Sequence, residues 1–469
     1  MTLTPQEQRD LIVAALPSAT DASTNAPQPS RLFAPSGHRS ALDPAVTLVR
    51  GGRGVGKTVW FLSLQQKSLR ELAAKEYRLP SLAELEVHPG YGSLLEPRYP
   101  GPGMIGRLLA EGRSEHVWQA VCMHALSDPD PNVAPDWIDL VRNLGTQPDL
   151  FETFIGNFDR LNTGRTHLIV FDALDRMSSD PEITNDLTIG LLKTALELRT
   201  RTRHIRAKVF ARPDLLPHRL PFADSSKLIA GEVELRWSPT NLYGLLFTLM
   251  ANAEHEAAKD FRSDGDWHQI AADVWRDANL AGDASRQIPV WATLASPFMG
   301  TNKKRGRTYA WLPTHLADGL QQASPRSFLS ALRTAADDSI QERSGHAQAL
   351  HWESIRVGVQ AASKIRVNEI REDIPWMERV FEPLDRMAVP APESDVLSRW
   401  EGANNLEPSL GDDDSEVRVG PRRWGGPELI EELAQLGVMT RRRDGRIDVP
   451  DVYRLAFGIT RKGGVPRMV

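Results

Sequence analysis

Cysteine is nearly absent, because the chain of 469 residues contains one, Cys122. A single cysteine excludes an internal disulfide and a zinc site built from several thiolates, so a small buried apolar role is expected. An excess of one charge is also lacking, since 56 Lys and Arg stand against 61 Asp and Glu, a formal net charge of −5. The chain as a whole has no general attraction for nucleic acid or membranes, and any such contact would need a local patch.

Long apolar runs are missing as well. The longest, Leu242–Met250, is far shorter than the roughly 20 residues that span a bilayer. The N-terminus has no basic stretch followed by an apolar core, the mark of a secretory signal. We therefore expect a cytoplasmic protein with no membrane contact. H-E-x-x-H and G-x-S-x-G patterns are also absent, so the sequence indicates neither catalytic zinc nor a serine nucleophile.

A glycine-rich segment, GGRGVGKT at 51–58, fits the pattern G-x-x-x-x-G-K-[ST]. It follows a β-branched run at 46–50 and precedes a helical pattern, which is the setting the motif requires. Glycines let main-chain N–H groups turn inward around an anion, and a helix N-terminus adds partial positive charge. We expect ATP and Mg²⁺ to bind here, with Lys57 at the β- and γ-phosphates and Thr58 on Mg²⁺. The predicted contacts are Gly51, Gly52, Arg53, Gly54, Val55, Gly56, Lys57, Thr58 and Val59.

Charged residues follow two later strand patterns. In LIVFDALDR, Asp172 ends a continuously apolar strand, and ligands of parallel sheets lie beyond such ends. Asp172 is predicted to hold Mg²⁺ together with Thr58. Asp175 is predicted to orient or deprotonate the attacking water, with a helix cap as the alternative. In AKVFARPD, Arg212 is predicted to sense the γ-phosphate, with a surface arginine before a proline turn as the alternative.

The alternation of strands and helices predicts an α/β core over 45–236, with a parallel sheet sandwiched by helices. Together with the phosphate-binding motif at 51–58, the P-loop, it predicts a P-loop NTPase core. The strand patterns lie at 46–50, 167–171, 207–211 and 231–236, and the helical patterns at 57–75, 104–126, 136–160 and 183–201. The remaining segments are predicted to be a flexible N-terminal stretch over 1–44 with the option of a short helix near 6–15, a helical lid over 237–387, a linker over 388–421 with some helix near 394–402, and a winged-helix-like module over 422–469.

These motifs together resemble the STAND class of P-loop NTPases, relatives of the AAA+ proteins, over roughly 45–335. The resemblance is carried by GGRGVGKT, LIVFDALDR, AKVFARPD and the helical region with SPR after it. It implies a slow ATPase that acts as a nucleotide switch in bacterial signalling or phage defence, with Arg212 in the place of the sensor arginine. It also implies a partner protein that carries the effector, and a homo-oligomer formed on ATP binding.

The C-terminal segment shows a helical pattern, a turn at Asp444-Gly445 and a second helical pattern, which resembles part of a winged helix. Its hairpin, 441–446, carries Arg441, Arg442 and Arg443, which suit phosphates. The preceding helix carries Glu428, Glu431 and Glu432, which a DNA groove would repel. A protein-packing role is therefore favoured over DNA reading.

Two more basic features have two readings each. The loop 303–307 suits nucleic acid or an acidic partner, or is merely solvated. Arg326 either approaches the nucleotide or forms a structural salt bridge. The leading hypothesis is a regulatory ATPase. The alternatives are a DNA-associated AAA+ ATPase and a scaffold that binds nucleotide without hydrolysis.

Overall fold

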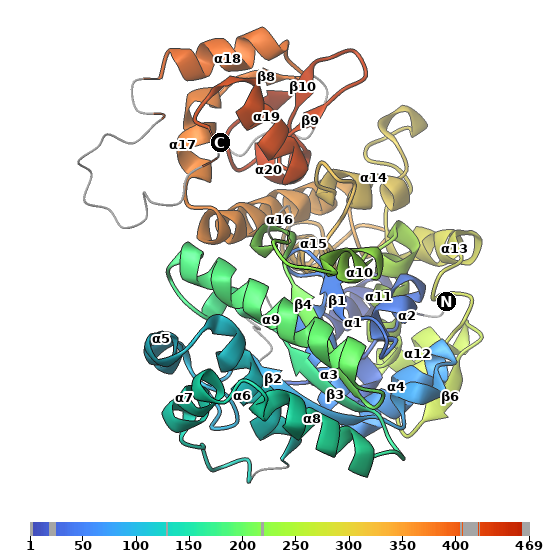
Figure 1. Cartoon of the computed structure of the whole chain (residues 1–469). Coiled ribbons are helices and arrows are strands. Elements are labelled where there is room, and N and C mark those ends of the chain that lie inside the picture. Colours follow the sequence, from blue (N-terminus) through green and yellow to red (C-terminus); the bar gives the residue numbers. More distant parts are fainter. Residues whose placement is uncertain are drawn as a thin grey trace. The chain divides into compact units, whose positions relative to one another are not determined.

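The computed structural model describes residues 3–17, 25–127, 130–216, 220–403, 406, 421 and 423–461. The chain divides into two compact units. One is the continuous stretch Ala22–Arg236, and the other combines Met1–Asp21 with Trp237–Val469. Figure 1 shows the elements of both units. The first unit is therefore an insertion, in sequence, within the second.

The first unit is built on a parallel sheet of five strands in the order β2-β3-β4-β1-β5. All four neighbouring pairs are parallel, which confirms the predicted α/β class and sheet type. The strands are β1 (Leu48–Arg50), β2 (Glu86–Tyr91), β3 (His167–Phe171), β4 (Ile205–Ala211) and β5 (Val233–Glu234). Strand β2 was not predicted, because Pro89 and Gly90 interrupt its pattern. Its position at the edge of the sheet is where a proline is tolerated.

Helices of this unit cover both faces of the sheet. Helices α6 and α9 pack on β2, β3 and β4, while α3 also contacts β2 and β4. Val170 and Phe210, whose side chains alternate with those facing α6 and α9, are at most 1% exposed. The helices are α2 (Arg39–Leu42), α3 (Lys57–Gln65), α4 (Lys67–Tyr77), α5 (Pro102–Glu111), α6 (Ser114–Leu126), α7 (Trp137–Thr146), α8 (Leu150–Leu161), α9 (Pro181–Arg201) and α10 (Ser225–Ala230).

Three of the four helical patterns divide into two helices. The breaks fall at Gln66, Gly112 and Gln147, whose backbones are not in the helical conformation. Gly112 is extended and ends α5, so the turn at this glycine separates α5 from α6. The helical spacing of apolar residues continues after each break, so periodicity alone predicts one long helix where the structure has two.

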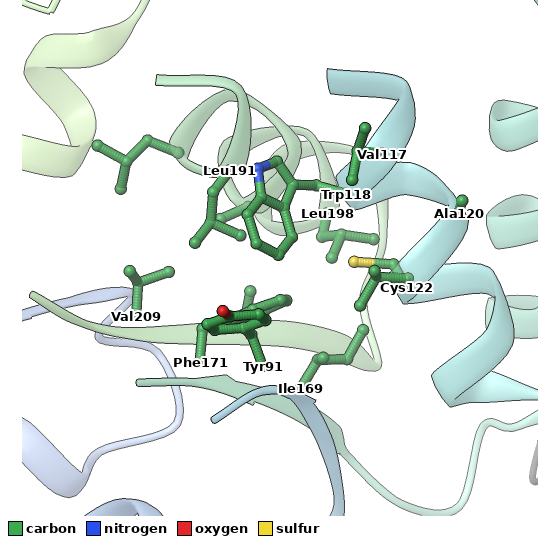
Figure 2. Packing of buried hydrophobic residues seen from close by; sticks show 14 of the residues in the cluster. Tyr91, Val117, Trp118, Ala120, Cys122, Ile169, Phe171, Leu191, Leu198 and Val209 are labelled. Atoms are coloured by element: carbon green, nitrogen blue, oxygen red, sulfur yellow. The ribbon is translucent and has the colours of Figure 1, made fainter. Parts of the chain in front are cut away.

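Aromatic packing fixes the end of β3. The Trp118 ring stands edge-on to Phe171 and Tyr91, with centroid separations of 5.8 and 5.9 Å, and Figure 2 shows it above both rings. Its indole N–H donates to the carbonyl of Leu187 at 2.7 Å. Cys122 lies in the same cluster and is 1% exposed, in its expected role. The strand position just before Asp172 is thereby held by a rigid core.

The second unit is mainly helical, as predicted for the region after 237. Its first part contains α1 (Pro5–Ala15), α11 (Pro239–Ala251), α12 (Ala257–Ser263), the hairpin β6 (His268–Ala271) and β7 (Val274–Arg276), α13 (Ala284–Leu294), α14 (Thr308–Leu316), α15 (Pro325–Glu342) and α16 (Trp352–Asp373). Tyr243 lies at the centre of this core and stacks on Tyr309 at 4.2 Å between ring centroids. Within the described residues, no helix is long and apolar enough to cross a membrane.

Helix α1 forms within the segment that was predicted to be flexible, at the place of the optional short helix. Thr4 and Glu7 make a capping box at its start. Arg9 is fully buried and donates to a run of main-chain carbonyls: Arg343, Ser344, His346, Gln348 and Ala349. Helix α1 is thus anchored to the rest of its unit by contacts distant in sequence.

The C-terminal part of this unit has one apolar core that extends from Val367 to Ile459. Its elements are α17 (Met377–Phe381), β8 (Ala388–Val389), α18 (Glu393–Glu401), α19 (Gly426–Gln435), β9 (Thr440–Arg441), β10 (Ile447–Asp448), α20 (Asp451–Arg454) and β11 (Thr460–Arg461). Ala391 and Ile447 exchange two main-chain hydrogen bonds of 2.9 and 2.8 Å. Strand β8 and helix α18 lie within the predicted linker, yet Val389, Ala391, Val396 and Trp400 belong to this core. The packed module therefore begins well before residue 422.

Candidate functional site

The glycine-rich segment forms the loop between β1 and α3. Gly54 and Gly56 have φ angles of 76° and 104°, in the left-handed region that favours glycine. A Cβ on Gly51 would stand 2.6 Å from Val55 Cγ2, which gives a steric reason for that glycine. Gly56 immediately precedes α3, so the first N–H groups of the helix open onto the loop.

Lys57 lies over this loop. Its Nζ donates to the carbonyls of Gly51 and Gly52, each at 2.8 Å. Burial lowers the pKa of Lys57 to about 8, and the nearby Asp172 carboxylate opposes that shift. The ammonium is therefore partnered by the same loop that would surround a phosphate. A phosphate oxygen can replace these two carbonyls, because it is the stronger acceptor for a cation.

Asp172 and Thr58 meet at the carboxyl end of the sheet. The Thr58 hydroxyl donates to Asp172 Oδ2 at 2.7 Å. The Asp172 N–H donates to the Tyr91 carbonyl at 2.9 Å, which ties the residue to β2. Asp172 is 2% exposed. Burial raises its pKa, while the hydrogen bond from Thr58 and the charge of Lys57 act in the opposite direction.

Oxygen donors of this kind fit Mg²⁺. A hydroxyl and a carboxylate are hard ligands, and Mg²⁺ usually takes one or two protein oxygens and completes its shell with phosphate oxygens and water. Across the described ranges, no group of three or more His, Cys, Asp or Glu side chains could hold a metal by itself.

Arg212 follows β4, the strand between β1 and β3, and is 8% exposed. Its Nε and Nη2 contact the two oxygens of Asp214 at 3.0 and 2.5 Å. Its Nη1 lies 3.3 Å from Asp175 Oδ2. The three predicted charged residues, Asp172, Asp175 and Arg212, therefore all lie at the carboxyl end of the sheet, after β3 and β4. Asp214 was not predicted, although an acid two residues after Arg212, across Pro213, was the available signal.

The remaining loop residues divide by burial. Val55 is buried, and Arg53 and Val59 are half-buried.

Ala173 adopts a left-handed φ of 58° immediately after Asp172, and the turn at Leu174–Arg176 that carries Asp175 follows it. Asp175 accepts no cap bond in that turn and instead pairs with Arg212. Its predicted alternative role as a helix cap does not apply here.

The predicted basic residues of the second unit differ in whether they form ion pairs. Arg326 pairs with Glu369 at 2.7 Å. In the hairpin 441–446, Arg441 pairs with Glu393 and Glu431, Arg442 with Asp448, and Arg446 with Asp444. Four basic side chains are exposed and, within the described part of the chain, form no ion pair: Lys303, Lys304, Arg305 and Arg307. Among the described residues, unpaired cations are therefore more numerous at 303–307, which has four, than in the hairpin, where Arg443 is exposed and forms no ion pair.

Solved structures that loosely resemble the chain include two archaeal proteins. Cdc6p from Pyrobaculum aerophilum matches with a TM-score of 0.35 and 12% identity, over 95% of this chain and 94% of that chain. The Orc1 protein of Aeropyrum pernix, in a structure with DNA, matches with a TM-score of 0.34 and 16% identity, over 96% and 94%. No family model and no curated protein matches the chain.

Proposed function

We propose that the chain is a Mg²⁺-dependent ATPase whose site lies at the carboxyl ends of strands β1, β3 and β4. One observation carries the proposal: the P-loop, Asp172 and Arg212 follow three adjacent strands, and Thr58 already contacts Asp172 at 2.7 Å. Adjacent parallel strands end at the same edge, where ligands of open α/β sheets bind. ATP is preferred over GTP because the sequence has no N-K-x-D pattern that would read guanine.

Each residue has a role that its contacts permit. The main-chain N–H groups from Gly52 to Thr58 surround the phosphates, and Lys57 exchanges its two carbonyl partners for β- and γ-phosphate oxygens. Thr58 and Asp172 would hold Mg²⁺, which would neutralise phosphate charge. Arg212 contacts the γ-phosphate.

Asp175 assists the water. The water oxygen bonds to the γ-phosphorus while the bond from that phosphorus to its bridging oxygen breaks. The water proton passes to the Asp175 carboxylate, and ADP and inorganic phosphate are released. The Asp175 side chain is 31% exposed, so water reaches it directly.

The test is equilibrium binding of ATP and ADP with Mg²⁺, together with phosphate release over many turnovers. We expect nucleotide retention and slow release that Asp175→Asn abolishes without loss of binding. Asp139→Asn, an exposed aspartate on α7, is the matched control and should release phosphate like the natural chain. If the natural chain retains no nucleotide, the proposal is wrong. If it binds but never releases phosphate, it is a scaffold instead.

We further propose a switch role of STAND type, on the strength of the sequence motifs and the division into two units. ATP would favour one arrangement and its loss another, with a change in assembly and a partner protein as effector. Molar mass and radius measured with and without a non-hydrolysable ATP analogue test this role. We expect a shift in at least one of them, and two unchanged values would exclude the switch.

A second candidate, a DNA-associated ATPase, is favoured by two observations in the second unit. The order α17, β8, α18, α19, β9 and β10, with Ala391 bonded to Ile447, resembles a winged helix. The 298–307 turn is ordered by a hydrogen bond of 3.0 Å from Met299 N to the Gly306 carbonyl, and it carries four cations at its surface.

This candidate would use 303–307 rather than the hairpin 441–446, because carboxylates already neutralise three hairpin arginines. Duplex binding as a function of salt tests it. Changing Lys303, Lys304 and Arg305 together to alanine should reduce the salt slope by roughly 3, about 1 for each phosphate whose charge is no longer neutralised. The same change at Arg441, Arg442 and Arg443 should alter it less. Binding that is absent or insensitive to salt would remove this candidate.

A further inference from the structure

Asp214 and Asp175 hold Arg212 unequally. Asp214 takes two edges of the guanidinium, through Nε at 3.0 Å and Nη2 at 2.5 Å. Asp175 takes Nη1 alone, at 3.3 Å. Paired contacts of a guanidinium with one carboxylate are stronger and more directional than a single long one. The contact with Asp175 is therefore the easier one to exchange.

The backbone makes Asp214 a fixed partner. Arg212, Pro213 and Asp214 enter the turn Pro213–Leu215, in which the Leu215 N–H donates to the Arg212 carbonyl at 3.2 Å. Pro213 fixes its own φ and restricts the residue before it, so the two side chains emerge in a set relation. Asp175 approaches from a different segment, the turn after β3. Its distance from Arg212 can change without disturbing β4.

A γ-phosphate is a competitor for the Asp175 side of Arg212. It brings more negative charge than one carboxylate, and it would lie at the end of the sheet where Arg212 stands. Resting on the function proposed above, we infer that Asp214 is a positioning residue and that Arg212 exchanges Asp175 for the γ-phosphate when ATP binds. Asp175 is then released to accept the water proton only when a γ-phosphate is present. With ADP, the Arg212–Asp175 pair stays in place.

The two aspartates should respond in opposite directions. Asp214→Asn loosens Arg212, so ATP affinity should fall about tenfold and the single-turnover rate of ATP cleavage should fall by at least as much. Asp175→Asn removes the charge that competes for Arg212, so ATP affinity should rise several-fold while cleavage is lost. ADP affinity should stay within about twofold in both variants, because Arg212 exchanges no partner for ADP.

The experiment measures Kd for ATP and ADP with Mg²⁺, single-turnover cleavage and the melting temperature of each full-length variant. Asp139→Asn serves as the control and should match the natural chain in all of these. A purely structural effect of Asp214 would weaken ATP and ADP alike, and that result overturns the exchange. Unchanged ATP affinity in Asp175→Asn also overturns it. A natural chain that binds neither nucleotide defeats the ATPase proposal itself, and the exchange falls with it.

Discussion

The Thr58 hydroxyl donates a hydrogen bond of 2.7 Å to Oδ2 of Asp172, although 114 positions separate the two residues. The contact exists because β4 lies between β1 and β3 in a parallel sheet. The segments that follow these three strands therefore all begin at the carboxyl end of the sheet. Two oxygen atoms that are suited to Mg²⁺ therefore meet at the carboxyl ends of these strands. The strand order is what brings them together.

Lys57→Ala should weaken ATP binding about 10- to 100-fold, since a hydrogen bond to a charged group contributes about 1.5–3 kcal/mol. Isothermal titration with Mg²⁺-ATP gives the two affinities. The matched control is Lys67→Ala, because Lys67 is 77% exposed and pairs weakly with Glu71. Equal affinity in Lys57→Ala and the natural chain would show that the loop does not bind the triphosphate through this ammonium.

ATP affinity should fall as the pH rises through about 8. Burial lowers the pKa of Lys57 to about 8, and only the protonated amine binds phosphates as a cation. The apparent affinity should therefore decrease about tenfold between pH 7 and pH 9. The residual binding of Lys57→Ala should show no such decrease over the same range. A flat profile for the natural chain would exclude Lys57 as the titrating group.

Asp172→Asn should abolish the Mg²⁺ dependence of ATP binding and stabilise the unliganded fold at neutral pH. Burial raises the pKa of Asp172 in the folded chain, so the folded state binds that proton more tightly than the unfolded state. The associated stability is complete below the ordinary carboxyl pKa and is lost as the pH rises through the folded pKa. The amide of asparagine never ionises, so this loss should disappear.

Melting curves at pH 5 and pH 7 measure the effect. Asp172→Asn should melt at a higher temperature than the natural chain at pH 7, and the difference should be smaller at pH 5. Asp139→Asn should reproduce the profile of the natural chain. A lower melting temperature for Asp172→Asn at pH 7 would mean that the ionised form stabilises the fold.

Gly90→Ala should destabilise the first unit by about 1–3 kcal/mol, the usual cost of overpacking a core. A Cβ at Gly90 would stand 2.3 Å from Phe171 Cε1 and 2.9 Å from Ile169 Cγ2. Chemical denaturation measures the change. Gly156→Ala on α8 is the control: a Cβ there meets nothing within 4 Å, so it should be neutral or slightly stabilising. Equal stability of the two variants would contradict the packing of β2 on β3.

Arg9→Ala should destabilise the second unit by about 3 kcal/mol or more, because several buried carbonyls would each lose a donor. Thermal melting followed by circular dichroism should show a lower transition. Arg107→Ala, at an exposed position on α5, should leave the melting curve unchanged. No shift in Arg9→Ala would mean that α1 contributes little to the unit, in line with the predicted flexible segment.

The residues of the proposed nucleotide site could be predicted from the sequence because their signals are local. A P-loop has a fixed spacing, and Asp172 and Arg212 directly follow apolar strands. Asp214 was missed because its pairing with Arg212 depends on the turn at Pro213, which spacing does not reveal. Strand β2 was missed because Pro89 and Gly90 are unusual in a strand and are explained only by its edge position and by Phe171.

The limits of the C-terminal module depended on contacts that no local pattern contains. Ala391 joins the module through Ile447, and Trp400 through Val380, whose carbonyl accepts its indole N–H at 2.9 Å. The segment 388–421 is predicted to be a linker because it contains little periodic apolar signal: strand β8 is short, and α18 has a modest apolar face. Long-range packing overrides composition at such places.

The insertion of the first unit, Ala22–Arg236, within the sequence of the second constrains the order of biosynthesis. Arg9 leaves the ribosome early, but the Ala349 carbonyl that it contacts is made 340 residues later. At about 5–20 residues per second, α1 waits roughly 15–70 s for its partners. The stretch Ala22–Arg236 is complete long before then and can fold while α1 is still exposed. During translation, a newly made chain therefore passes through a stage in which the parallel sheet of the first unit can form while most of the residues that contact α1 have not yet been made.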